Sequence, residues 1–174
     1  MEVFHVKTSI FLIQEPKDSI LEKKYEELNL LTETSNYVES LQKAFYLDEE
    51  ASDSKNLFLK FKIKSLFAKI YRKNNDHIKA IAIYKKSLKL LNDFLFEDDG
   101  IIFTKQKYLA KTLLNIGSHF QLLKKYDSAV FYYKKLDDII NNENEVLDYK
   151  AISYANLSGI YQFDTTYSDH LNKA

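Results

Sequence analysis

Apolar, aromatic and small residues recur in one register along this chain. Three small residues each follow an apolar residue and precede, by three positions, an aromatic residue. The small residues are Ala68, Gly117 and Ser158, after Phe67, Ile116 and Leu157 and before Tyr71, Phe120 and Tyr161. Ala80 and Ala129 lie twelve residues beyond the first two, and Tyr84 and Tyr133 four residues further on. The pattern predicts a repeated helix hairpin, a unit that buries its apolar face by stacking on copies of itself.

The same periodicity predicts seven or eight helices and no strands. We expect them near residues 17–31, 36–49, 55–72, 77–95, 101–123, 126–141 and 145–163, with a short last helix from Tyr167. Three Gly and one Pro in 174 residues leave few positions for tight β-turns. The predicted N-caps, whose side-chain oxygens accept from first-turn amides, are Asp53 or Ser54, Asp76 and Asn144.

The most regular stretch is 110–140. Its key positions are Ile116, Gly117, Phe120, Tyr126, Ala129, Tyr133 and Leu136. This column pattern resembles the tetratricopeptide repeat (TPR) family, in its bacterial type with long helices. The resemblance implies an all-α helix-hairpin repeat solenoid, a right-handed superhelix of about 7–8 antiparallel helices.

The repeat register divides the chain into a leader segment, 1–16, and one helical repeat domain, 17–174. Within the domain we expect a degenerate repeat at 17–49, repeats near 55–96 and 101–142, and an incomplete repeat at 145–174. Gly117 follows Ala68 by 49 residues and Ser158 follows Gly117 by 41, whereas the family repeats about every 34 residues. Longer helices are therefore expected. Three residues depart from the family pattern: Tyr37 in a small-residue column, Ser87 where a small apolar residue is usual, and His170 in an alanine column.

The composition of the chain argues against several classes of protein. Lys plus Arg and Asp plus Glu both number 25, which argues against direct nucleic-acid binding. No stretch approaches the roughly 20 apolar residues of a membrane span. Residues 3–13 are apolar but lack the basic start and cleavage site of a signal peptide. With no cysteine to indicate a redox compartment, we expect a cytoplasmic protein, or a periplasmic one if a leader has been removed.

The sequence gives no support for catalysis. Its four histidines, His5, His77, His119 and His170, form no metal-binding motif such as HExxH. Three glycines are too few for a phosphate-binding loop, and no nucleophile elbow is present. We therefore expect no catalytic residue, no metal and no cofactor.

The family resemblance implies a concave groove lined by the first helix of each hairpin. The residues predicted to bind there are Lys62, Lys69, Arg72, Lys73, Lys111, Asn115, Gln121, Asn156 and Gln162. Asn115 shares a repeat column with Asn156, and Gln121 with Gln162, so successive repeats would present ladders of amides. An amide both donates and accepts, which suits binding of an extended peptide backbone. The alternative is that these polar residues only solvate helix faces.

The basic end of the groove is suited to an acidic side chain or a C-terminal carboxylate. Asn115 matches one column of the carboxylate clamp that the family's chaperone-tail binders use. The other columns hold Ser65, Lys69, Ile152 and Asn156 and do not reproduce it. That specificity is therefore not expected here.

Two functions of different class follow. The first is a non-catalytic scaffold or adaptor that binds an extended protein or peptide segment in the groove. The second is the sensory, ligand-binding part of a bacterial transcriptional or signalling regulator whose output module is not in this chain. In either case the apolar C-terminal end is a candidate homodimer surface.

Overall fold

The computed structural model describes residues 16–34, 36–93, 99–139 and 144–163, and these form seven α-helices and no strand. The helices are α1 (Pro16–Glu33), α2 (Tyr37–Glu50), α3 (Leu57–Lys73), α4 (His77–Asp93), α5 (Asp99–Leu122), α6 (Tyr126–Lys134) and α7 (Asn144–Phe163). The all-α expectation is confirmed. The leader up to residue 15 and the last helix from Tyr167 lie outside the described residues.

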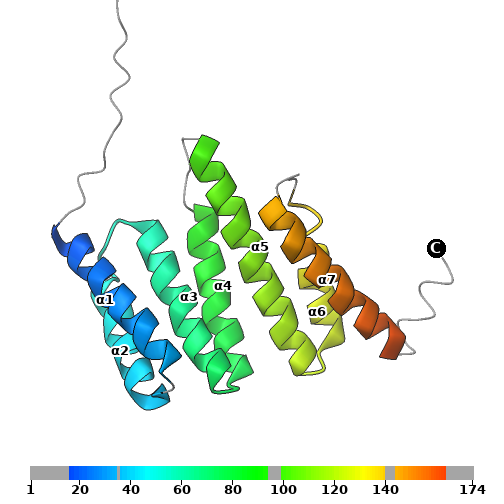
Figure 1. The fold of residues 1–174 in the computed structure, drawn as a ribbon, viewed down its shortest axis with the longest axis horizontal. Helices are drawn as coiled ribbons and strands as arrows, with labels where there is room; N and C mark the ends of the chain where they lie inside the picture. The colour runs from blue at the N-terminus through cyan, green and yellow to red at the C-terminus, as the bar shows by residue number, and fades with distance from the viewer. Residues whose placement is uncertain (1–15, 35, 94–98, 140–143, 164–174) are drawn as a thin grey trace, which may run out of the picture.

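The helices follow one another in chain order across the molecule (Figure 1). Each packs against the next, and α1 also contacts α3 while α5 also contacts α7. The buried residues include the small residues of the first two copies of the pattern and the tyrosines sixteen residues later, whereas Ser158 of the third copy is exposed. Ala68 and Tyr84 are buried together between α3 and α4, and Tyr133 packs into a second core between α5 and α6. In the α3–α4 and α5–α6 hairpins, the small and aromatic columns therefore meet at the interfaces between helices.

The turns of the α3–α4 and α5–α6 hairpins have the same geometry. Asn75 has φ 59° and Lys124 has φ 56°, and each lies seven residues after the small residue of its hairpin. The next amide reaches back five residues in both turns, from Asp76 to the Tyr71 carbonyl at 3.0 Å and from Lys125 to the Phe120 carbonyl at 2.9 Å. A left-handed residue with such a bond ends a helix tightly and reverses the chain.

One predicted N-cap is confirmed and another is wrong. Asp76 Oδ1 accepts from the Lys79 amide at 3.1 Å, as expected. Helix α3 begins at Leu57, two residues later than predicted, and its cap is Asn56, whose Oδ1 accepts from the Leu59 amide at 2.9 Å. Ser54 does not cap the helix: its Oγ accepts from the Asn56 amide at 3.0 Å, before the helix begins, and its hydroxyl donates to Asp18 of α1 at 2.7 Å. The side chain of Asn144, the first residue of α7, is not among those described.

Helix α6 ends at Lys134, well before the predicted residue 141. The chain continues in turns, with the Leu136 amide bonded to the Tyr133 carbonyl at 3.0 Å and the Ile139 amide to the Leu136 carbonyl at 3.2 Å. Leu136 and Ile139 are both buried. Their three-residue spacing lets tight turns bury both side chains, so the apolar periodicity continues where the α-helix does not.

Within the described part of the chain, none of the helices combines the length and apolar character needed to cross a bilayer.

Candidate functional site

A hollow of about 540 Å³ lies among helices α1, α3, α4 and α5, and we call it the basic hollow. Its lining includes five of the nine residues predicted to bind a partner, namely Lys62, Lys69, Arg72, Lys111 and Asn115. The described lining residues include no aspartate or glutamate. Helical periodicity places these side chains on one side of α3 and α5, and helix packing brings the two helices together around the hollow.

The four cations of the basic hollow differ in their partners. The Lys62 ammonium lies 4.7 Å from the centre of the Tyr25 ring, a cation–π contact. Lys69 Nζ forms an ion pair with Glu33 Oε1 at 2.6 Å. Arg72 and Lys111 form no ion pair with any described residue. Three of the four cations, Lys62, Arg72 and Lys111, are therefore without a carboxylate partner among the described residues.

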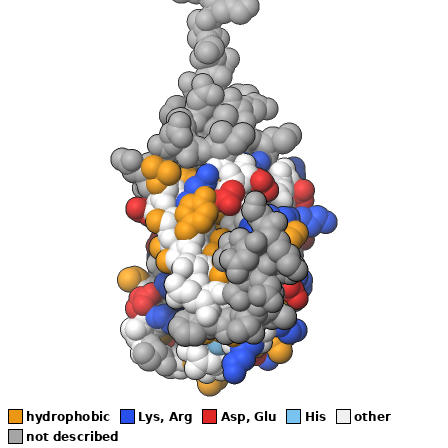
Figure 2. Space-filling model, turned by 90° about the vertical axis from the view of Figure 1, so that its right-hand side faces the viewer, with side chains coloured by type: hydrophobic (Ala, Val, Ile, Leu, Met, Phe, Trp, Pro, Cys, Tyr) orange, Lys and Arg blue, Asp and Glu red, His pale blue; other side chains and the backbone are white. Residues whose placement is uncertain are grey.

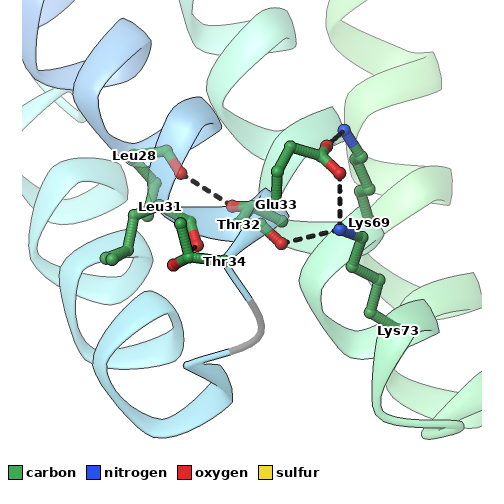
Figure 3. Close-up of polar contacts among 7 residues, drawn as sticks. All are labelled: Leu28, Leu31, Thr32, Glu33, Thr34, Lys69 and Lys73. Atoms are coloured by element: carbon green, nitrogen blue, oxygen red, sulfur yellow. Dashed lines mark hydrogen bonds and ion pairs between the residues drawn. The ribbon is translucent and has the colours of Figure 1, made fainter.

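Glu33, at the end of α1, joins α1 to α3 through two lysines (Figure 3). Its second carboxylate oxygen accepts from Lys73 Nζ at 2.8 Å, and Lys73 also donates to the Thr32 carbonyl at 2.7 Å. The hydrogen bonds from Lys69 and Lys73 lower the pKa of Glu33 to about 2. Lys73 lines a separate hollow of about 320 Å³ with Thr32 and Tyr37 and is not a lining residue of the basic hollow.

Ser65, another lining residue, carries a buried hydroxyl with no hydrogen-bond partner among the described residues. Burying a hydroxyl without a partner costs free energy, so such a group is unusual in a folded protein. Beyond the position of Ser65 in the predicted groove, no feature of the sequence predicted this unpaired hydroxyl. The basic hollow therefore contains a polar group for which the protein itself supplies no partner.

We expect Ser65→Ala to raise the free energy of unfolding by about 1 kcal/mol, since the change removes an unpaired polar group and introduces a better helix former. The measurement is urea unfolding followed by circular dichroism. Ser87→Ala is the matched control, because the buried Ser87 hydroxyl donates to the Tyr84 carbonyl at 2.9 Å. A loss of stability in the Ser65 variant would show that its hydroxyl is satisfied in solution.

The amides of Gln121 and Asn156 meet at the hydroxyl of Tyr133. The Tyr133 hydroxyl donates to Gln121 Oε1 at 2.7 Å and accepts from Asn156 Nδ2 at 3.1 Å, while Ser118 Oγ lies 3.3 Å away. Burial raises the pKa of Tyr133. These bonds link α5, α6 and α7, a structural role that sequence reasoning missed. An amide has further donor and acceptor capacity, so a peptide ligand would share or displace these bonds.

Gln162 lies apart from the other predicted residues, near the end of α7. It lines a shallow hollow of about 440 Å³ with Tyr154, Leu157, Ser158 and Tyr161, all of the same helix. Its side-chain amide donates to Ser158 Oγ at 3.3 Å. Figure 2 views this end of the molecule and shows hydrophobic side chains among charged ones. Exposed Leu147 and Tyr154 belong to the same helix.

The described residues contain no group of three or more His, Asp or Glu side chains placed to hold a metal ion. The chain matches no family model, and no curated protein matches it.

Proposed function

We propose that this chain is a non-catalytic interaction module built as a TPR-like solenoid, with a right-handed superhelical course. Two observations support the repeat. The hairpin turns at Asn75 and Lys124 have the same left-handed conformation at the same distance from Ala68 and Gly117. In each hairpin a tyrosine sixteen residues after the small residue is buried in the core. Matching turns and matching contacts favour repetition of one unit.

The surface that receives the partner includes the basic hollow. The observation that carries this proposal is the convergence of five predicted binding residues, from α3 and α5, around one hollow with no described carboxylate in its lining. Asn115 lies in this lining beside Lys111 and Thr112. Cations and an amide on parallel helix faces suit an extended peptide segment with an acidic group. We therefore propose a scaffold or adaptor role.

A peptide-library screen that includes free C-termini tests this function. We expect selective enrichment with the parent chain and its loss, with helical circular dichroism intact, in the double variant Asn115→Ala with Asn156→Ala. The single variant Asn115→Ala separates binding from stability, because Asn156 also donates to Tyr133. Equal enrichment by the parent and both variants would exclude the amides from binding. No enrichment by the parent would contradict the peptide-binding proposal.

A further inference from the structure

The basic hollow concentrates positive charge in a chain that has no net charge overall. Its described lining carries Lys62, Lys69, Arg72 and Lys111, and only Lys69 is paired with a carboxylate, that of Glu33. Like charges gathered in one hollow repel one another, and an anionic occupant relieves that repulsion. Because a carboxylate neutralises only one of these four cations, three positive charges remain unpaired with a carboxylate. A dianion therefore matches the hollow better than a single carboxylate does.

The donors around the basic hollow also suit a group with several oxygens. Arg72 presents a planar fork of N–H donors, a geometry that matches phosphate as well as carboxylate. Lys111 adds a second unpaired cation, and Ser65 a hydroxyl that has no partner among the described residues. The Asn115 amide provides two more N–H donors. A carboxylate offers two oxygens to these groups, whereas a phosphate monoester offers three and a second negative charge.

Four aromatic residues form much of the remaining wall of the hollow, together with Asn29, Leu66 and Thr112. Tyr25, Phe61, Tyr84 and Tyr108 line it, and the Phe61 and Tyr108 rings pack edge to face with centroids 5.3 Å apart. The volume of about 540 Å³ lies within the usual range for small-molecule sites and exceeds what a phosphate group alone would fill. The aromatic wall can therefore pack against the organic group that carries the phosphate.

We propose that the basic hollow binds the dianion of a phosphate monoester whose organic part packs against this aromatic wall. If that organic part belongs to a peptide, the site is the anion-binding part of the proposed peptide groove, and in that case it rests on the proposed function. A free small phosphate ester presents the same chemistry. Because the second pKa of a phosphate monoester is about 6, binding should weaken as the pH falls below that value.

Titration of the full chain with phenyl phosphate, followed by calorimetry at pH 7.5, tests the site. We expect saturable binding, at least tenfold tighter than that of benzoate, and at least a tenfold loss of affinity in Arg72→Gln with Lys111→Gln. The control is Lys86→Gln with Lys89→Gln, which removes the same charge from exposed positions on α4 outside the hollow. Melting curves check that both double variants remain folded.

Three results would overturn the phosphate site: equal losses in the two double variants, benzoate binding as tight as phenyl phosphate, or no binding of phenyl phosphate. Peptides enriched in the library screen are then synthesised with tyrosine and with phosphotyrosine. Equally tight binding of the tyrosine and phosphotyrosine peptides would support the peptide groove and reject the phosphate site. Binding of phenyl phosphate without enrichment of any peptide from a library that also contains phosphotyrosine peptides would support the phosphate site, reject the peptide function and indicate a free ester as ligand.

Discussion

Gly117→Ala is expected to destabilise the fold by about 1–3 kcal/mol, and Gly117→Leu by more, because both insert atoms into a filled contact. A Gly to Ala change inside a helix ordinarily stabilises by roughly 0.5–1 kcal/mol, because alanine has the higher helix propensity. Gly117 lies inside α5, and its backbone conformation is an ordinary helical one with negative φ. A loss of stability would therefore be caused by the packing around residue 117, and not by strain in the backbone.

The contact is with the ring of Tyr133. A Cβ atom at residue 117 would lie 2.6 Å from Tyr133 Cε1 and 2.7 Å from Cδ1, far inside normal carbon–carbon contact. The ring has little freedom to move, since Tyr133 is fully buried and its hydroxyl is bonded to Gln121 and Asn156. Any shift of the ring strains these bonds. A small rotation of the Tyr133 side chain therefore cannot relieve the clash with the added Cβ atom.

Gly159→Ala supplies the matched control. Gly159 lies in α7, and a Cβ atom there would have no neighbour within 4 Å. The same chemical change should therefore stabilise the protein by roughly 0.5–1 kcal/mol. Urea unfolding of both variants measures the two effects. If both substitutions changed stability in the same direction, the close packing of α5 on α6 at Tyr133 would be contradicted.

The helices could be predicted from the sequence because each buries a face that repeats with helical periodicity. Their ends were harder to predict, since each depends on competition between local groups. Ser54 was an equally good cap by residue type, but its Oγ accepts from the Asn56 amide before the helix begins, and Asn56 caps α3. Beyond the end of α6, the buried Leu136 and Ile139 have a spacing that fits an α-helix and a run of tight turns alike.

The candidate site could be predicted in part for the same reason. Periodicity places Arg72 and Lys111 on corresponding faces of α3 and α5, and the structure brings both to one hollow. Periodicity does not predict which side chain of a neighbouring helix lies opposite a given residue. The Glu33 pair with Lys69 and the Tyr133 bonds with Gln121 and Asn156 join residues of different helices, so no spacing in the sequence reports them.

His119 should make the fold sensitive to mild acid. The side chain is 2% exposed, and its ring is stacked on that of Tyr84 with centroids 5.8 Å apart. Its Nδ1 lies 3.1 Å from Nδ1 of His77, a hydrogen bond that requires at least one of these nitrogens to be unprotonated. Its Nε2 is buried and has no partner among the described residues. Protonation would place a charge in this interface with no described carboxylate bonded to it.

Burial, with smaller effects from the charges of His77 and Arg72, lowers the pKa of His119 to about 4. The unfolded chain binds this proton with a pKa near 6.5, so between these values the unfolded state holds more protons. Stability contributed by neutral His119 is therefore complete above about pH 6.5 and is lost as the pH falls toward 4. The loss amounts to about 2 kcal/mol at pH 5 and approaches about 3 kcal/mol near pH 4.

His119→Gln isolates this effect because glutamine does not titrate. The variant starts less stable at pH 7.5, since it loses ring packing on Tyr84, but it should lose about 2 kcal/mol less than the parent between pH 7.5 and pH 5. Groups that do not contact His119 titrate alike in both proteins, so they cancel in the difference. The measurement is the free energy of unfolding in urea at each pH. Parallel pH profiles for the two proteins would show that His119 is accessible to protons in the folded state, and the α4–α5 interface would then be more open than the structure shows.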